Sequence, residues 1–159
     1  MNSEKENRTD ISDALALAQD AARNCACLKA RKLARQVTRD YDAALRDSGL
    51  KITQFTMLAA VVVAGNSVSL TELAERLGMD RSTFSRNLKP LVRRGLVEHS
   101  EALKGRSRTV IATEAGVSVF ANSAPAWRVA QDRLLNKLAA ADCRGFLDDI
   151  RAVNNQLAA

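Results

Sequence analysis

Histidine is nearly absent from this sequence, and aromatic residues are scarce. His99 is the single histidine, and aromatic residues make up 4% of the 159 residues. One histidine excludes a metal centre built on several imidazoles. The sequence also offers no nucleophile–base pair, no glycine loop for phosphate and no carboxylate pair at a convincing spacing. We therefore expect no enzyme activity, no metal and no cofactor, with a core mainly of leucine, valine and alanine.

Long apolar runs are missing as well. No stretch is long enough to cross a bilayer as a helix, and the opening residues MNSEKENRTD lack the apolar core of a signal peptide. We expect a cytoplasmic protein with no membrane partner. The three cysteines of such a protein do not form a disulfide framework. The length suits one domain over residues 1–159.

The stretch from Ser69 to Arg108 predicts a short helix, a tight turn, a second helix and a basic hairpin. Ser69 can cap the first helix, with Glu72 at the capping-box spacing. Gly78 can end it, because glycine adopts the left-handed conformation without a Cβ penalty. Between them an apolar stripe recurs at helical intervals. This stripe is Leu70, Leu73, Ala74 and Leu77.

The second helix is predicted from Arg81 to about Arg94, with Asp80 as its cap and Gly95 as its end. Its apolar side holds Phe84, Leu88, Leu91 and Val92. At about 100° per residue, the opposite side collects Ser82, Arg86, Lys89 and Arg93. Such groups can bond base edges or phosphates, although a solvated basic face on a structural helix has the same composition. Pro90 should bend the helix near Arg86.

The hairpin would form from a first strand of Leu96, Val97 and the residues after them and a second strand over residues 108–111, with Lys104 and Arg106 near its tip. Such a wing would lay Arg106 and Arg108 along phosphates or into the minor groove, unless it is an ordinary solvated hairpin. From Arg81 to Arg108 there are eight basic and two acidic residues, and this net charge of +6 equals that of the whole chain. A charge excess confined to one segment is typical of nucleic-acid binding.

The run SLTELAERLGMDRSTFSRNLKPLVRRGLV, followed by GRSRTVIATEAG, closely resembles the MarR family of bacterial transcriptional regulators, over about residues 28–116. The resemblance implies a mainly α fold with a small β-hairpin wing, a winged helix-turn-helix with long N- and C-terminal dimerisation helices. It also implies DNA contacts by recognition-helix residues, which are here Arg81, Ser82, Thr83, Ser85 and Arg86, and by wing residues Arg106 and Arg108. Many relatives carry an aspartate that orients the first wing arginine, where this chain has Lys104. With the basic face, the candidate DNA contacts also include Lys89, Arg93 and Lys104.

Long helices are predicted on both sides of the DNA-binding lobe, which spans about residues 50–112. The first covers about residues 10–47, with a break near Asn24 and a stripe of Cys27, Ala30, Ala34, Val37, Tyr41 and Leu45. Thr53 is the expected cap of a helix ending near Gly65. Thr113 should cap a helix over about residues 114–140, which Pro125 would bend or interrupt. A last helix is expected over about residues 142–157.

The C-terminal helices carry more apolar surface than a DNA-binding lobe can cover. The residues concerned are Val119, Trp127, Leu134, Leu135, Leu138, Phe146 and Ile150. We expect the terminal helices of two subunits to interlock in a homodimer, which lets one recognition helix read two half-sites. A helical monomer that covers its own terminal helices is the alternative.

The cysteines offer a sensing mechanism. Six basic residues and no acidic residue lie from Arg23 to Arg39, and nearby cations stabilise a thiolate. In one continuous helix, Arg23 and Arg31 would each lie one turn from Cys27. The placement of Cys27 fourteen residues before Tyr41 resembles the peroxide-reactive cysteine of the OhrR branch of the family, although Ile52 occupies the second tyrosine position. Cys143 could then resolve the oxidised cysteine across the dimer.

Other interpretations of these cysteines remain open. Cys27 lies on the apolar stripe and could be a small buried hydrophobe. In a helix Cys25 and Cys27 would lie about 200° apart, which disfavours metal or arsenite binding.

Two alternatives to a redox-regulated repressor also remain. A winged helix can serve as a protein-interaction module, but such a module needs no cationic face. The family also implies a pocket for a phenolic or aromatic effector between the dimer helices and the DNA-binding lobe. We predict a dimeric repressor of double-stranded DNA that a small-molecule or redox signal releases from its operator.

Overall fold

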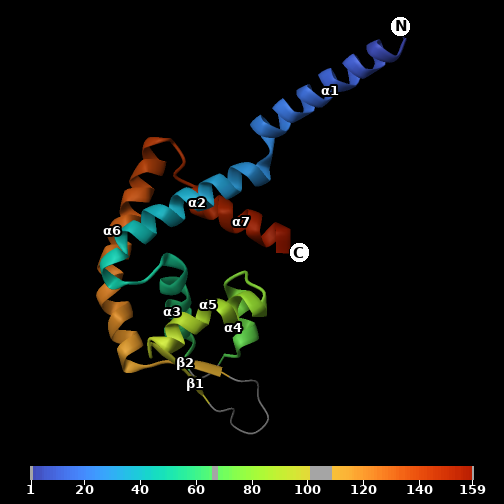
Figure 1. Ribbon diagram of the computed structural model, residues 1–159. Helices are drawn as coiled ribbons and strands as arrows, with labels where there is room; N and C mark the ends of the chain where they lie inside the picture. The colour runs from blue at the N-terminus through green and yellow to red at the C-terminus, as the bar shows by residue number, and fades with distance from the viewer. Residues whose placement is uncertain (1, 66–67, 101–108, 159) are drawn as a thin grey trace. The chain divides into compact units, whose positions relative to one another are not determined.

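The computed structural model describes residues 2–65, 68–100 and 109–158 and is mainly helical, with one small antiparallel hairpin (Figure 1). The predicted fold class is therefore confirmed. The elements are α1 (Asn2–Asn24), α2 (Ala26–Ala44), the 3-10 helix η1 (Arg46–Ser48), α3 (Ile52–Ala64), α4 (Leu70–Arg76), α5 (Arg81–Arg93), β1 (Val97–Ser100), β2 (Thr109–Ala112), α6 (Glu114–Ala140) and α7 (Phe146–Ala158). The chain divides into two compact units, residues 1–39 and 40–159. Each is described by itself below.

The first unit holds α1 and most of α2. Helix α1 begins at Asn2, so the prediction of a start near Asp10 was too late; the opening residues contain no proline or glycine that would prevent helix formation. The break predicted near Asn24 is confirmed, because only Cys25 separates the two helices. Backbone hydrogen bonds from Cys25 N to the Ala21 carbonyl and from Lys29 N to the Cys25 carbonyl, each 3.1 Å, span this break.

The second unit begins with the end of α2 and the turn into α3. Gly49 takes a left-handed conformation with φ of 66° after η1, as a glycine there permits. Helix α3 starts at Ile52, so the prediction that Thr53 caps it was wrong. The first amide of α3 is instead bound from outside the helix, because the Asp42 carboxylate accepts from Ile52 N at 2.7 Å. This side-chain cap from α2 fixes the start of α3.

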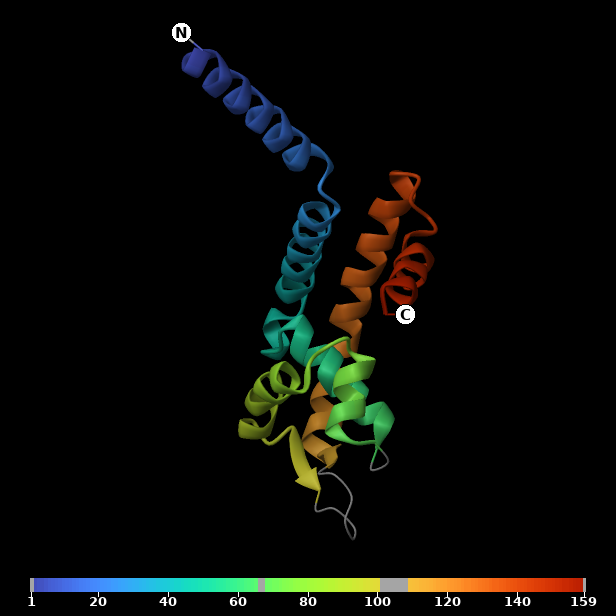
Figure 2. The same cartoon turned by 90° about the vertical axis from the view of Figure 1, so that its right-hand side faces the viewer.

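The core of the second unit lies among α3, α4, α5 and the hairpin, which lie together in both views (Figures 1 and 2). Its largest fully buried side chains include Met57, Leu58, Leu73, Phe84 and Leu91. Strands β1 and β2 pair from Val97 with Ala112 to Ser100 with Thr109. A single antiparallel bridge joins Ser69 to Thr109, so the start of α4 is tied to the hairpin.

Helix α6 packs against this core through aromatic rings. The ring centroid of Phe55 on α3 lies 5.0 Å from that of Phe120 and 5.8 Å from that of Trp127. Val119 and Trp127 pack against the core, so both are partly covered within one chain. Leu135 and Ile150, also expected at a dimer surface, are exposed.

Both ends of α6, Glu114 and Ala140, match the sequence prediction. Thr113 Oγ1 accepts from Gly116 N at 3.0 Å, so the predicted cap is confirmed. Helix α6 continues through Pro125, which does not interrupt it. Helix α7 begins at Phe146 rather than near residue 142, because Asp142 has a φ of 57° and ends the preceding turn. Among the described residues, no helix combines the length and apolar character needed to cross a membrane.

Candidate nucleic-acid interface

Helix α4 and its turn support α5 from one side. Ser69 Oγ accepts from Glu72 N at 3.2 Å, which confirms the predicted N-cap. The Glu72 carboxylate pairs with Arg76 at 2.8 Å rather than closing a capping box. Gly78 has a φ of 62° in the turn after α4, where a left-handed residue lets the chain reverse. This geometry places the N-terminus of α5 directly after a tight turn.

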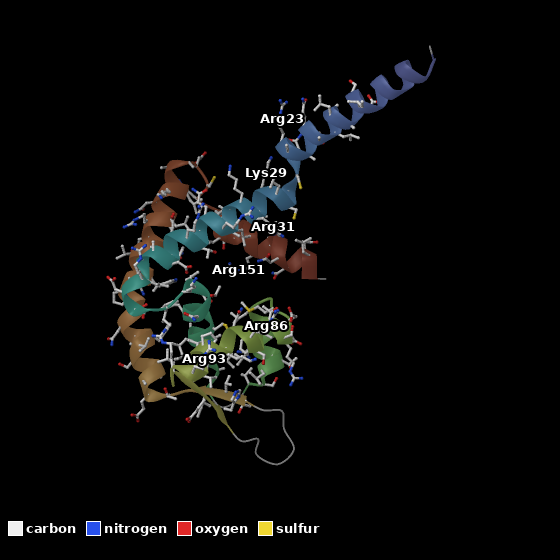
Figure 3. All side chains as sticks on the ribbon, in the orientation of Figure 1. Arg23, Lys29, Arg31, Arg86, Arg93 and Arg151 are labelled. Atoms are coloured by element: carbon white, nitrogen blue, oxygen red, sulfur yellow. The ribbon has the colours of Figure 1, made fainter. Side chains whose placement is uncertain are left out.

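Helix α5 has the two sides that the sequence predicts. Phe84, Leu88 and Leu91 are buried, and Val92 is partly buried. Ser82, Arg86, Lys89 and Arg93 are all exposed and fall within about 60° of one another around the helix axis. We call these four residues the basic face. Figure 3 shows Arg86 and Arg93 on this one helix, about two turns apart; the helix continues through Pro90 to Arg93.

The first turn of α5 is organised by Asp80. Its carboxylate accepts from Thr83 N at 2.8 Å, from Thr83 Oγ1 at 2.7 Å and from Ser82 Oγ at 2.5 Å. These hydrogen bonds hold the pKa of the Asp80 carboxyl well below its usual range, with the Ser82 hydroxyl the largest cause. Arg86 Nη2 in turn donates to Thr83 Oγ1 at 3.1 Å. Arg81 and Ser85 are exposed, and Thr83 is partly buried.

The far end of α5 is anchored to two other elements. Arg94 Nη1 donates to the Gly49 carbonyl oxygen at 2.7 Å, and Nη2 donates to that of Ser48 at 3.4 Å. Thr113 Oγ1 donates to the Gly95 carbonyl oxygen at 2.7 Å. The orientation of α5 is therefore fixed against η1 and α6 as well as by its buried side. The basic excess of this segment thus includes one cation, Arg94, with a structural role.

The predicted wing residues fall outside the described part of the hairpin. Lys104, Arg106 and Arg108 lie in residues 101–108, so their contacts stay a prediction. The register of β1 and β2 brings the two ends of that segment together at Ser100 and Thr109. His99 is exposed opposite Val110. No group of three histidine, cysteine, aspartate or glutamate side chains that could hold a metal ion occurs within the described ranges.

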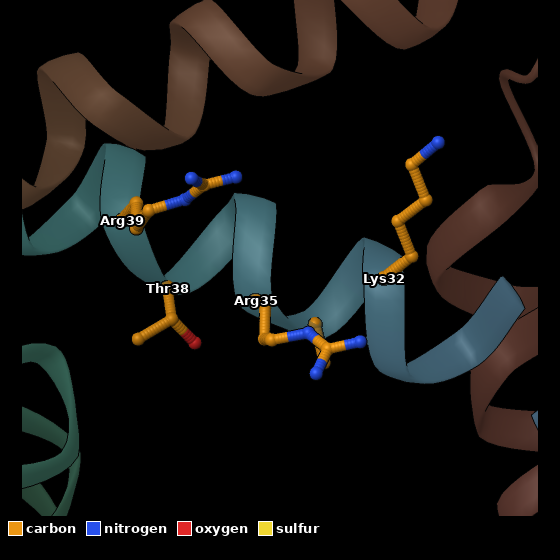
Figure 4. Close-up of a pocket in the computed structure, with 5 residues that line it drawn as sticks. Lys32, Arg35, Thr38 and Arg39 are labelled. Atoms are coloured by element: carbon orange, nitrogen blue, oxygen red, sulfur yellow. The ribbon is translucent and has the colours of Figure 1, made fainter. Parts of the chain in front are cut away.

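Most of the cations counted from Arg23 to Arg39 lie on α2. Lys32, Arg35 and Arg39, with Ala34 and Thr38, line a hollow of about 490 Å³, and Figure 4 shows the labelled side chains leaving one helix. None of these three cations has an ion-pair partner among the described residues. A second hollow, of about 300 Å³, lies in the second unit. It is lined by Ala44, Asp47, Ser48, Val119, Asn122, Ser123 and Ala126.

All three cysteines are exposed free thiols, so the alternative of Cys27 as a buried hydrophobe is wrong for the single chain. Cys25 Sγ accepts from Leu28 N at 3.5 Å and caps α2. Because α1 ends before Cys25, the continuous helix assumed for the 200° separation and for the Arg23 neighbour does not exist there. Figure 3 shows Arg23 on α1, with Lys29 and Arg31 on α2.

Tyr41 lies in the second unit and Cys27 in the first, so a cysteine–tyrosine contact stays a prediction. The Tyr41 hydroxyl donates to Gln131 Oε1 on α6, and burial raises the pKa of this phenol. Cys143 Sγ donates to the Ala141 carbonyl oxygen at 3.4 Å. The described contacts of Tyr41 and Cys143 are therefore local or structural.

Two important residues were not on the predicted site list. Asp80 was predicted only as a cap, yet the hydroxyls at the second and third helical positions, Ser82 and Thr83, were a signal that its carboxylate would bind more than one donor. The anchoring role of Arg94 carries no local signal, because its partner Gly49 lies 45 residues earlier in the sequence.

The comparisons with known proteins agree with this geometry. A model of the MarR family matches residues 48–107. The crystal structure of the Mycobacterium tuberculosis transcriptional regulator MosR is 32% identical, covers 85% of this chain and 96% of its own, and superposes with a TM-score of 0.74. The same regulator in complex with DNA is 34% identical, with coverages of 86% and 100% and a TM-score of 0.71.

A more distant structure shares the fold. The MepR–DNA complex of Staphylococcus aureus is 15% identical, covers 82% of this chain and 97% of its own, and has a TM-score of 0.69. Among curated protein sequences, none matches this chain significantly.

Proposed function

The chain belongs to the MarR family of transcriptional regulators, and from this premise we propose that it is a homodimeric repressor that binds operator DNA through α5 and the wing. The protein is a DNA-binding transcriptional regulator. The basic face of α5 carries the proposal, because it is solvent-exposed and backed by a buried core. The structure of MosR with DNA, at 34% identity, supports it. Such a regulator would act in the cytoplasm.

We assign the DNA contacts by element. The first turn of α5 supplies Arg81, Ser82, Thr83 and Ser85, and the basic face adds Arg86, Lys89 and Arg93. The side chains of Ser82 and the three cations project from one side of α5, and the major groove of DNA is wide enough to admit an α-helix. The wing would add Lys104, Arg106 and Arg108 along the phosphates. Arg94 is left out of this set, because it binds the Gly49 carbonyl oxygen.

The dimer is supported by apolar side chains left exposed on α7. Leu147, Ile150, Val153 and Leu157 recur at helical spacing and are all at least one-third exposed. A second copy of the chain would cover them and place a second α5 at the next half-site.

The test is fluorescence anisotropy on duplex DNA from the intergenic region upstream of the gene, with random duplex as the competitor, at several salt concentrations. We expect selective binding whose affinity falls steeply with salt. Replacing Arg86 with alanine should cost about 1–3 kcal/mol of specific binding if it reads a base. Arg128→Ala, which removes an exposed cation of α6, is the charge-matched control and should leave binding unchanged.

Two results would contradict this assignment. Equal affinity of wild type and Arg86→Ala for every duplex would mean that the basic face does not read DNA. If the affinity does not depend on salt, or if the protein binds no duplex at all, a protein-interaction module would be favoured over a DNA-binding one.

We propose the hollow beside α6 as the effector site. Its volume of about 300 Å³ is at the lower end for a small-molecule pocket, and Asn122 and Asp47 provide polar groups for a phenolic ligand. Salicylate and 4-hydroxybenzoate are the first probes. Release of DNA by either compound from wild type but not from Asn122→Leu would support the site, and equal release from both proteins would contradict it.

Peroxide sensing is a second candidate, favoured by the exposure of Cys25, Cys27 and Cys143. Under this proposal hydroperoxide oxidises Cys27, with Tyr41 as its phenolic partner and Cys143 as the resolving thiol. Cys27→Ser should then keep DNA binding in the presence of hydroperoxide, whereas wild type loses it and recovers it with reductant. Retained peroxide sensitivity in Cys27→Ser would contradict the role of this thiol.

A further inference from the structure

The direction of the hydrogen bonds at the start of α5 constrains what its hydroxyls can recognise. The Asp80 carboxylate lies 2.5 Å from Ser82 Oγ and 2.7 Å from Thr83 Oγ1. An ionised carboxylate accepts hydrogen bonds and donates none. Both hydroxyl protons must therefore point at Asp80. This assignment holds at neutral pH, because the same hydrogen bonds keep the pKa of Asp80 well below its usual range.

The two hydroxyls differ in the number of lone pairs that remain free to accept a hydrogen bond. A hydroxyl has one donor and two acceptor lone pairs. Thr83 Oγ1 also accepts from Arg86 Nη2 at 3.1 Å, so one of its lone pairs is occupied. Ser82 is exposed and accepts no hydrogen bond from the described residues, so both of its lone pairs remain free. Toward a ligand, Ser82 is an acceptor without a donor.

We propose that Asp80 is a specificity-determining positioning residue, which makes the Ser82 hydroxyl an acceptor for base amino groups in the major groove. The inference rests on the proposed function, since it requires α5 to lie in that groove. The major-groove edge presents two such donors, the N6 amino group of adenine and the N4 amino group of cytosine. The other groups are acceptors: guanine O6 and N7, thymine O4 and the phosphate oxygens. None of them could form a hydrogen bond with Ser82 Oγ, because an acceptor would face a lone pair.

Asp80 also acts against indiscriminate binding. Its negative charge lies at the N-terminus of α5, where backbone amides would otherwise attract a phosphate. The side chain satisfies the Thr83 amide itself, at 2.8 Å. The same carboxylate thus removes a phosphate site and fixes the polarity of the neighbouring hydroxyl.

The experiment begins with selection of binding sites from a randomised duplex pool by the full-length wild-type protein. A selected sequence defines the operator and tests the proposed function separately. If no sequence is selected, the proposed function is overturned and this inference with it. On the selected duplex, each adenine is then replaced by purine and each cytosine by 2-pyrimidinone, which deletes one amino group at a time.

Wild type should lose roughly three- to tenfold in affinity at one position of each half-site, which is the contribution of one hydrogen bond. The affinity of Ser82→Ala should be the same with and without the amino group at that position. Because both proteins are measured on the same duplexes, any weakening of the duplex by the modified base cancels.

Asp80→Gly separates polarity from capping. Oδ1 of Asp80 accepts from both Thr83 N and Ser82 Oγ, so any side chain that keeps the cap oxygen would also hold the Ser82 proton. Glycine is still accepted at an N-cap and removes both carboxylate oxygens, so the Ser82 hydroxyl proton is released to bind acceptors. We expect the penalty for the deleted amino group to disappear, while binding to random duplex strengthens. Asp132→Asn removes an equal charge from an exposed position of α6 and should keep the wild-type penalty.

Two outcomes would overturn the inference while leaving the proposed function intact. In the first, wild type selects a sequence but no amino deletion costs affinity. In the second, Asp80→Gly keeps the wild-type penalty at the same position. A folding defect in Asp80→Gly would be visible as a lowered Tm, and the comparison of wild type with Ser82→Ala then decides alone.

Discussion

Arg94 Nη1 donates to the Gly49 carbonyl oxygen at 2.7 Å, and this hydrogen bond ties the end of α5 to the turn after η1. The adjacent Arg93 is also exposed but makes no side-chain hydrogen bond or ion pair with the described residues. Two consecutive arginines therefore have separate tasks. Arg94 orients α5, and Arg93 is available to DNA.

This division predicts opposite phenotypes for two neighbouring substitutions. Arg94→Ala should lower the free energy of unfolding by about 1 kcal/mol, because an exposed hydrogen bond is lost, which lowers Tm by about 2–4 °C for a chain of this size. Arg93→Ala should leave Tm unchanged and weaken DNA binding with a shallower salt dependence. Calorimetry and anisotropy on both variants measure the two effects. If both variants lose DNA affinity equally with no change in Tm, Arg94 is a DNA contact instead.

Gly116 of α6 packs closely against the backbone of Leu96, the residue before β1. A Cβ at this position would lie 1.9 Å from the Leu96 carbonyl oxygen, and that oxygen already accepts from Thr113 N at 3.1 Å. Gly116→Ala must therefore push α6 away from the core, at a cost of about 1–3 kcal/mol or more. Urea denaturation checks this value.

Gly145→Ala is the matched control for that substitution. Its Cβ would lie 3.6 Å from Asp149 Oδ2, which is ordinary contact, so stability should change by no more than about 0.5 kcal/mol. Equal stability of the two variants would show that α6 does not approach Leu96 this closely.

The parts of the fold predicted from sequence are those decided by neighbouring residues. Ser69, Asp80 and Thr113 each cap a helix whose first amides lie two or three residues away, so the local pattern is sufficient. Phe84 and Leu88 are buried because their spacing already places them on one face.

The sequence predictions were wrong where the local structure depends on a residue that is distant in the sequence. Asp42 binds the Ile52 amide from ten residues earlier, and no pattern around Thr53 reveals that partner. Arg94 was counted with the basic excess because its bond to Gly49 spans 45 residues. The direction of the Ser82 and Thr83 hydroxyl hydrogen bonds also could not be predicted. The sequence places both hydroxyls near Asp80 but does not show which atom each proton points to.

The depressed pKa of Asp80 predicts how its contribution to stability varies with pH. The folded-state pKa lies below the ordinary value of 3.8, so ionised Asp80 stabilises the fold at every pH above that value, and the stabilisation is lost as the pH falls toward the folded-state pKa. The difference in unfolding free energy between wild type and Asp80→Asn should therefore be constant from roughly pH 5 to 8 and shrink below roughly pH 4. Urea denaturation across this range measures it. A difference that grows on acidification would contradict the direction of the shift.

The exposed apolar side of α7 predicts how the dimer can be broken. Ile150 lies between Leu147 and Val153 on that side and is 39% exposed, so Ile150→Asp should leave the single chain folded while placing a charge in the interface. Asn155→Asp adds the same charge about 140° away around α7. Light scattering after gel filtration should give about twice the chain mass of 17.3 kDa for wild type and Asn155→Asp, and a smaller mass for Ile150→Asp. Because two recognition helices bind cooperatively only when joined, Ile150→Asp should also lose operator affinity while retaining weak binding to random duplex. A wild-type mass of one chain would instead mean that the apolar side of α7 is not a dimer interface, and each α5 would then read its half-site alone.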